Sequence, residues 1–415
     1  MYTKINQCRI CGNQNLVLVL DLGEQTLTGI FPKSKDEKIT SGPLRLVKCA
    51  GLGDVCGLLQ LEHSYDLGEM YGENYGYRSG LNTSMVLHLQ TKIKNILSRI
   101  AITDGDLIVD IGSNDSTTLQ AYPMDNLTLV GVDPTGLKFK KYYPDHINLI
   151  PDFFSSKLIN QKYPGKKAKI VTSFSMFYDL EEPVKFMEQI FDILDEQGVW
   201  VFEQSYMPAM LEMNSYDTVC HEHLEFYALH QIKWMADKVG FKIIDVELND
   251  INGGSFSIMV AKKCSNYVPT PKVLQILNDE ITKKLDKLET YKDFSSRIEK
   301  LRNELINFVN TAKSEGKRVA AIGASTKGNV LLQYCGFTEN SIFNIGEVNK
   351  DKFGSYTPGT LIPIISEDEL IAAKPDYLIV LPWHFRDFFL ANKKFENVNF
   401  VFPLPKLEVI NVSKK

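Results

Sequence analysis

Residues 106–119 read DLIVDIGSNDSTTL. An apolar, β-branched run leads into a single glycine, Gly112, and then into polar residues suited to the start of a helix. A strand that passes through a glycine turn into a helix is the place where an open α/β sheet binds a nucleotide-like ligand. The stretch therefore predicts an α/β fold with a ligand at this turn.

Four more short apolar runs follow along the chain: LTLVGVDPT, INLIP, KIVTSFSMF and VWVFEQ. Helix-compatible segments separate them, and residues 84–100 before them have helical spacing. Strands that alternate with helices form a parallel sheet covered on both faces. The runs FKIIDVELND and GGSFSIMVAKK add an edge hairpin. We expect a central Rossmann-like domain over residues 76–265.

A helical stretch and a second α/β pattern fill residues 266–415. Between Pro271 and Gly316, apolar residues recur every three or four positions, which predicts one long helix or a helical pair. This period fits either a coiled coil or a helix packed against the next domain. RVAAIGASTKGNVLLQYC, NIGEVNKD and DYLIVLPWHF then predict a strand, a glycine turn, a helix and further strands of a C-terminal Rossmann-like domain.

Four of the seven cysteines lie within the first 56 residues: Cys8, Cys11, Cys49 and Cys56. The spacing suits two knuckles that present four thiolates to one tetrahedral Zn²⁺. Four sulfur ligands close the coordination sphere, so the metal would be structural. Reduced cysteines without a metal and a CxxC redox pair are the alternatives. Short apolar runs around the cysteines predict a small, mostly β zinc-binding module over residues 1–75.

Length and composition narrow the function classes. A chain of 415 residues predicts two or three domains. Its 46 Lys and Arg against 51 Asp and Glu give a formal charge of -5, whereas a general nucleic-acid binder is normally basic. Every apolar run is shorter than the ~20 residues of a membrane span, and the N-terminus lacks an apolar signal core. We expect a cytoplasmic protein, either a monomer or a small homo-oligomer.

The turn at Gly112 also indicates the kind of cofactor. The chain lacks the GxGxxG spacing that brings backbone against a pyrophosphate. An adenosyl ligand without phosphates needs only backbone room at Gly112 and polar groups at Ser113, Asn114 and Asp115. Asp133 ends the next strand, where its carboxylate can accept hydrogen bonds from both ribose hydroxyls. Together these residues favour S-adenosylmethionine over NAD.

Candidate catalytic groups concentrate in Cys220-His221-Glu222-His223. A histidine with an ordinary pKa of ~6.5 is the best-matched general base near neutral pH. The two histidines are one residue apart, whereas catalytic zinc proteases place theirs one helical turn apart. A hydrogen-bonded loop without chemistry is the alternative.

Two further stretches carry candidate substrate contacts. In MYGENYGYRSGLN, Tyr75, Tyr77 and Arg78 can grip a sugar and a phosphate, or they can pack a domain junction. In GASTKGN, Lys327 and Asn329 stand at an expected helix start that suits a phosphate, although a capped helix after a glycine turn is also plain architecture.

The order of these pieces resembles the three-domain sugar C-methyltransferases, which add a methyl group from S-adenosylmethionine to C3 of a nucleotide-linked 4-keto-deoxysugar. Nearly the whole chain takes part in the resemblance. Its landmarks are CRICG with a later KC and CGLLQL, YRSGLNTSM, DIGSND, CHEHLEFY, NGGSF, GASTKGNVLLQYCGF and SYTPGTLIPI. The resemblance implies a zinc module, a methyl-donor domain and a C-terminal domain that helps to bind the nucleotide sugar in the cleft between them.

The resemblance also implies roles for individual residues. It puts the general base on His223 with Glu222 beside it, and the cofactor loop on Gly112, Asn114 and Asp115. Tyr75, Tyr77 and Tyr178 are further catalytic candidates. Two departures stand out: Cys220 replaces a tyrosine of well-known members, and Tyr178 and Asp179 stand where those members carry a histidine.

The expected function is therefore C-methylation of a nucleotide-linked keto-deoxysugar in deoxysugar biosynthesis, through an enolate. A base must meet the C–H proton while the ketone oxygen is stabilised. Methylation at oxygen or nitrogen of another small metabolite is an alternative, and so is a non-catalytic zinc-module scaffold.

Overall fold

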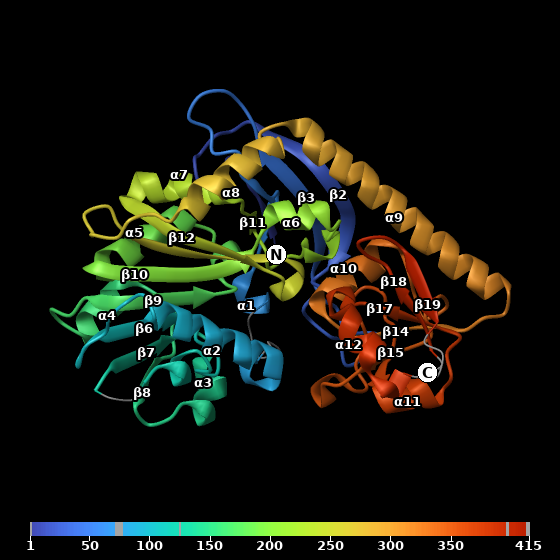
Figure 1. Ribbon diagram of the computed structural model, residues 1–415. Helices are drawn as coiled ribbons and strands as arrows, with labels where there is room; N and C mark the ends of the chain where they lie inside the picture. The colour runs from blue at the N-terminus through green and yellow to red at the C-terminus, as the bar shows by residue number, and fades with distance from the viewer. Residues whose placement is uncertain (1, 71–77, 124–125, 396–397, 412–415) are drawn as a thin grey trace.

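The computed structural model describes residues 2–70, 78–123, 126–395 and 398–411. Figure 1 shows a blue N-terminal module above the junction of two larger α/β bodies, one green and one orange to red. The α/β class with three parts is confirmed.

The N-terminal module consists of two small antiparallel sheets. One pairs β1 (Tyr2–Lys4) with β5 (His63–Tyr65). The other runs in the order β11-β4-β3-β2, with β2 (Leu16–Thr26), β3 (Ser41–Cys49) and β4 (Leu59–Leu61) from this module. Its edge strand β11 (Glu225–Phe226) comes from the central part of the chain. The module ends in the short helix α1 (Leu67–Met70).

The central domain is a seven-stranded sheet in the order β12-β13-β10-β9-β6-β7-β8. The predicted parallel strands are β6 (Leu107–Ile111), β7 (Thr128–Val132), β8 (Ile147–Ile150), β9 (Ala168–Phe174) and β10 (Leu194–Ser205). The predicted hairpin is β12 (Phe241–Asn249) with β13 (Ser255–Lys262), which pairs antiparallel with β10. The strand predictions are confirmed.

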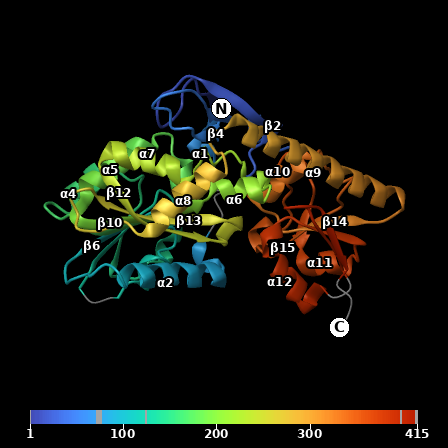
Figure 2. The ribbon, with the colours of Figure 1, turned by 45° about the horizontal axis from the view of Figure 1, so that its top comes forward.

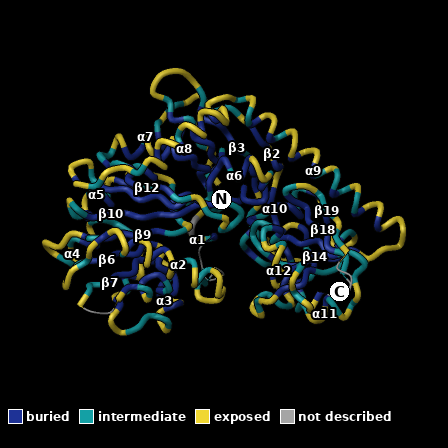
Figure 3. The backbone as a smooth tube through the Cα atoms, viewed as in Figure 1, coloured by how far each residue is buried: buried dark blue, intermediate teal, exposed yellow. Residues whose placement is uncertain are grey.

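Helices cover both faces of this sheet because the strands are apolar on both sides. Along β10, Trp200 and Phe202 face one cluster, while Val199 and Val201 face the other. The first cluster includes α4 (Ser156–Lys162), α5 (Pro183–Ile193) and α7 (Leu229–Val239), and the second includes α2 (Thr83–Leu97). The short helices α3 (Gly136–Phe139) and α6 (Met207–Glu212) follow β7 and β10. Figure 3 shows the strands as the buried centre.

The C-terminal domain repeats the scheme. Its sheet has the order β16-β15-β14-β17-β18-β19. The parallel strands are β14 (Val319–Ile322), β15 (Ile345–Glu347), β16 (Ile364–Ser366), β17 (Tyr377–Val380) and β18 (Asn399–Phe402), and β19 (Glu408–Asn411) pairs antiparallel with β18. Helices α10 (Thr326–Tyr334), α11 (Glu367–Ala372) and α12 (Arg386–Ala391) complete it.

A helical pair joins the two large domains. The sequence left open whether this stretch forms a coiled coil or packs against the next domain. The helices are α8 (Pro271–Thr282) and α9 (Leu288–Ser314). α9 packs along β2 of the N-terminal module and reaches β14, so its apolar stripe serves domain packing and not a coiled coil. Figure 2 shows the same long helix running from the N-terminal module along the C-terminal domain.

Candidate functional site

The four N-terminal cysteines meet at one point. The Sγ atoms of Cys8 and Cys56 lie 3.4 Å apart, those of Cys11 and Cys49 lie 3.5 Å apart, and all four lie within 4.8 Å of one another. Sulfurs about 2.3 Å from a tetrahedral zinc stand about 3.8 Å apart, so the cluster fits Zn²⁺. Asn13 donates Nδ2–H to Cys49 Sγ over 3.3 Å, as an outer-shell partner does.

Local turns bring the first two thiols together. The Gly12 N–H donates to the Cys8 carbonyl over 2.9 Å, and the Cys8 N–H donates to the Asn13 carbonyl over 2.8 Å. Gly12 has φ +71°, a conformation that a glycine adopts at little cost. The short CxxC spacing therefore closes into a knuckle, and the four cysteines predicted as zinc ligands lie together.

The predicted cofactor turn lies at the carboxyl end of β6. Gly112 has φ +72°, and a Cβ there would lie 3.2 Å from Met176 Cγ, so only glycine fits without displacement. The Asn114 N–H donates to Asp133 Oδ2 over 2.8 Å. Thr135 donates to Asp133 Oδ1 through its N–H and its hydroxyl over 2.7 and 2.6 Å. The carboxylate predicted to hold the ribose is thus already oriented.

The other residues of this turn have contacts of their own. The Ser113 hydroxyl lies 2.8 Å from the hydroxyl of Tyr143. Asp115 Oδ2 accepts the Gly80 N–H over 3.0 Å and lies 3.5 Å from Arg78 Nε. Arg78 also stacks on the Tyr142 ring, 4.3 Å from its centroid, so it lies beside the turn.

One cavity of about 640 Å³ joins the turn to the predicted base. Its lining comes from the central domain and from α10, and among the predicted site residues it includes Gly112, Ser113, Asn114, Asp133, Tyr178, Glu222, His223 and Lys327. The glycine turn, the strand-end carboxylate and an apolar wall that contains Met176 and Phe154 fit an adenosyl cofactor.

His223 is held in one tautomer. Its Nδ1 lies 2.8 Å from the Thr218 carbonyl oxygen, which only accepts, so Nδ1 carries the proton and Nε2 keeps its lone pair. Burial, together with the positive charge of Lys327, lowers the pKa of His223 to about 4. The sequence led us to expect an ordinary pKa of ~6.5 for this histidine, and the buried environment corrects that expectation. The imidazole is uncharged at pH 7 and stays uncharged until the pH falls to about 4.

Glu222 lies where the three parts of the chain meet. A Cβ on Gly29 would lie 2.4 Å from Glu222 Oε1 and 3.7 Å from Thr326 Oγ1, so any other residue at 29 would displace the Glu222 carboxyl. Burial raises the pKa of the Glu222 carboxyl. Its neighbour His221 is fully buried and packs edge-on against Tyr65 with 4.6 Å between ring centroids, away from the cavity lining.

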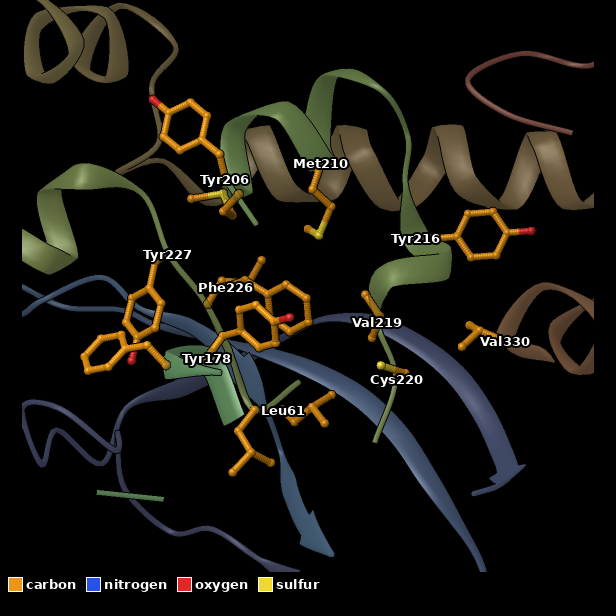
Figure 4. Packing of buried hydrophobic residues seen from close by; sticks show 14 of the residues in the cluster. Leu61, Tyr178, Tyr206, Met210, Tyr216, Val219, Cys220, Phe226, Tyr227 and Val330 are labelled. Carbon is orange, nitrogen blue, oxygen red and sulfur yellow. The ribbon is translucent and has the colours of Figure 1, made fainter. Parts of the chain in front are cut away.

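The two departures from the sugar C-methyltransferase pattern both lie at the cavity. The ring of Tyr178 meets His223 edge-on, with centroids 4.5 Å apart. Burial raises the pKa of the Cys220 thiol, which keeps it protonated. Figure 4 shows Tyr178 and Cys220 within a packed cluster that also includes Leu61 of the N-terminal module and Val330 of α10.

The C-terminal domain brings one of its two predicted substrate residues to the cavity. Lys327 lines it, and its Nζ donates to the Asn252 carbonyl over 2.9 Å. Asn329 is fully buried and donates Nδ2–H to the Thr28 carbonyl over 2.8 Å, so the structure gives it a contact between domains and does not place it in the cavity lining. Tyr75 and Tyr77 lie outside the described residues.

Sequence reasoning missed three groups of this site. Asp110, at the end of β6, lines the cavity, accepts from the Thr172 hydroxyl over 2.5 Å, and has its pKa raised to about 7 by burial. Its place at the end of the strand before Gly112 was a usable signal. Thr218 and Asn252 act through backbone carbonyls, which carry no residue-specific signal.

Among the residues that the structure describes, no helix combines the length and the apolar character needed to cross a bilayer.

Family models match three successive parts of the chain. The model described as "Putative zinc binding domain" matches residues 8–71, "Methyltransferase domain" matches residues 85–246, and "C-methyltransferase C-terminal domain" matches residues 250–405. The chain is also similar to C-methyltransferase NovU of Streptomyces niveus, with 28% identity over 414 residues that cover 98% of this chain and 97% of the relative.

Solved structures give partial likenesses. The plantazolicin methyltransferase BpumL, in complex with a pentazolic desmethylPZN analog and SAH, is 13% identical with a TM-score of 0.33, over 42% of this chain and 83% of that one. A structure titled "A Pericyclic Reaction enzyme" is 16% identical with a TM-score of 0.34, over 41% of this chain and 46% of that one.

Proposed function

We propose that this chain, an S-adenosylmethionine-dependent C-methyltransferase with a structural zinc, methylates C3 of a nucleotide-linked 4-keto-deoxysugar. One observation carries the proposal: a single cavity joins the cofactor turn to a neutral histidine whose free nitrogen is fixed in one tautomer. Transfer to carbon beside a ketone needs such a base next to the methyl donor.

His223 takes the proton in this proposal. A C–H bond beside a ketone ionises when a base meets the proton and the oxygen is stabilised as it gains charge. With Nδ1–H bound to the Thr218 carbonyl, Nε2 is the nitrogen that accepts. The low pKa keeps the imidazole in its accepting form, and negative charge that forms on the substrate beside it raises that pKa during the step.

Lys327 supplies the complementary charge. It lines the same cavity from α10, so its ammonium can stabilise an enolate oxygen or hold a phosphate of the substrate. Tyr178 packs on His223 and fixes the plane of the imidazole, and its hydroxyl is a second candidate for the ketone oxygen.

The residues that would hold the cofactor are Gly112 with Ser113, Asn114 and Asp133. When bound, the cofactor supplies an electrophilic methyl group to the carbon that His223 has deprotonated. Asp133 orients the ribose end, because its carboxylate is already aligned by Asn114 and Thr135.

Methylation at oxygen or nitrogen of another metabolite is the nearest alternative, and it needs no C–H base. A non-catalytic scaffold is disfavoured because burial holds His223 neutral inside the cavity that the cofactor turn lines.

The test is incubation of the purified enzyme with labelled S-adenosylmethionine and a panel of dTDP-, GDP- and CDP-linked 4-keto-deoxysugars. We expect label on C3 of at least one sugar. A parallel reaction with S-adenosylhomocysteine in D₂O should place deuterium at C3 without methylation. Label on oxygen or nitrogen, or no exchange with any accepted sugar, would reject the proposal.

A further inference from the structure

The segment that carries His223 continues into the sheet of the N-terminal module. β11 pairs antiparallel with β4, with Glu225 opposite Gln60 and Phe226 opposite Leu59. The Leu61 N–H donates to the Leu224 carbonyl over 2.8 Å, one residue after His223. Backbone hydrogen bonds therefore fix this segment to β4 directly after the proposed base.

The second metal knuckle holds the same segment further along. Gln231, in the first turn of α7, donates Nε2–H to the carbonyls of Cys56 and Gly57 over 3.0 and 3.1 Å. The Cys56 thiol belongs to the four-cysteine cluster. Residues 224–231 are thus held at both ends by the module that binds the metal.

Arg9 adds a side-chain link from the first knuckle, where it lies between Cys8 and Cys11. Its side chain is only 3% exposed. Nη1–H donates to the Leu61 carbonyl over 2.7 Å and Nη2–H donates to the Ser64 hydroxyl over 2.8 Å, which orients the guanidinium within its own module. Its Nε lies 3.4 Å from Glu181 Oε2 and 3.7 Å from Glu225 Oε1.

Both carboxylates beside Arg9 belong to segments that shape the cavity. Glu181 lines it and comes just after Tyr178, and Glu225 comes two residues after His223. Glu225 is 2% exposed, and neither of its carboxylate oxygens has a hydrogen-bond partner among the described residues. Burial raises the pKa of the Glu225 carboxyl, and the positive charge of Arg9, 3.7 Å away, opposes that rise. Arg9 is thus the charged side chain in contact with this buried carboxyl.

We propose that Arg9 is a positioning residue for the methyl transfer. By holding the Glu225 strand and the Glu181 loop against the metal module, it fixes His223 and Tyr178 at the cavity. The proposal rests on the proposed function, because it assumes that His223 is the base. If Arg9 has this role, the metal-binding module does more than fold around its zinc, because it also positions the residues of the chemical step.

The test compares Arg9→Gln with Arg45→Gln as a matched control. Arg45 lies on β3 of the same N-terminal module, is 38% exposed and pairs with Asp21 over 2.9 Å. Arg9→Gln should keep one zinc per chain and the wild-type affinity for S-adenosylhomocysteine. Its kcat and its rate of C3 deuterium exchange should fall on the order of 10- to 100-fold, because a misplaced base is inefficient. Arg45→Gln should match the wild type in all four measurements.

A structural readout separates this proposal from the proposed function. Hydrogen–deuterium exchange of the backbone over residues 218–231 should rise in Arg9→Gln, whatever the substrate is. Glu225→Leu removes both carboxyl oxygens from the same contact on the side of the central domain and leaves the knuckle intact. It should give the same pattern, which also covers a failure of Arg9→Gln to fold. Unchanged backbone protection in either soluble variant, or loss of activity in proportion to lost zinc, would overturn the proposal. A different result would reject only the assignment of His223 as the base. In that case backbone exchange rises in Arg9→Gln, but the wild-type enzyme never exchanges deuterium at C3 of the sugar.

Discussion

His223 Nδ1 lies 2.8 Å from the carbonyl oxygen of Thr218, and this contact leaves Nε2 as the nitrogen that can take a proton. His223→Asn keeps a hydrogen-bonding side chain but cannot accept the proton. We expect kcat to fall by about 10²–10⁴ with little change in cofactor affinity. Steady-state kinetics with calorimetry of S-adenosylhomocysteine binding checks this. If His223→Asn still exchanged deuterium at C3 at the wild-type rate, the base would be another residue, with Tyr75, Tyr77 and Tyr178 the next candidates.

The charge of Lys327 should influence the pH below which the enzyme loses activity. Burial and the positive charge of Lys327 together lower the pKa of His223 to about 4. His223 accepts protons only above its pKa, so activity should fall as the pH drops through that value, and Lys327→Met should move this limb to higher pH. The measurement is kcat/KM against pH, which reports the free enzyme. Lys350→Met, on an exposed residue of the same domain, is the control and should leave the limb in place.

Asp133 should carry the ribose of the cofactor. Asp133→Ala removes acceptors for hydrogen bonds and the partner of the Asn114 N–H, so cofactor binding should weaken by about 1.5–3 kcal/mol. Titration calorimetry with S-adenosylhomocysteine measures this, with the exposed Asp145→Ala as the matched control. Equal affinity in the two variants would move the ribose contact elsewhere, and tighter binding of NAD would reject the cofactor.

The four-cysteine cluster should hold one zinc per chain. Structural zinc contributes directly to folding, so Cys8→Ser with Cys49→Ser should lose the metal and become poorly soluble. Elemental analysis and thermal unfolding provide the measurements, and the exposed Cys264→Ser is the control. Metal content and stability equal to the wild type in the double variant would contradict this prediction.

Much of the architecture could be predicted because strands, helices and the metal knuckle are each encoded by a short continuous stretch of sequence. Runs such as LIVDI and LTLVGV form strands wherever both faces are covered, and the Cys8–Cys11 spacing closes a knuckle without help from distant residues. Strand β11 has only two residues and pairs with a strand about 165 positions earlier, so no periodicity could reveal it.

The two residues predicted to contact a phosphate show a second reason why prediction from sequence falls short. Lys327 and Asn329 are two positions apart in α10, and helical residues at this spacing point to different sides. Lys327 therefore reaches the cavity while Asn329 contacts Thr28. The pKa of His223 escaped sequence reasoning for a related reason, because burial and the charge of Lys327 depend on the assembled domains.

The edge strand β11 also defines what can be recombined between such enzymes. A chimaera that exchanged only residues 1–70 would give the incoming sheet a foreign fourth strand, with Gln60 and Leu59 facing residues chosen for another partner. Residues 224–231 would have to travel with that block, although more than 150 positions separate the two pieces. The unit that laboratory shuffling can transplant is thus discontinuous, and breakpoints drawn at the domain borders would cut through it.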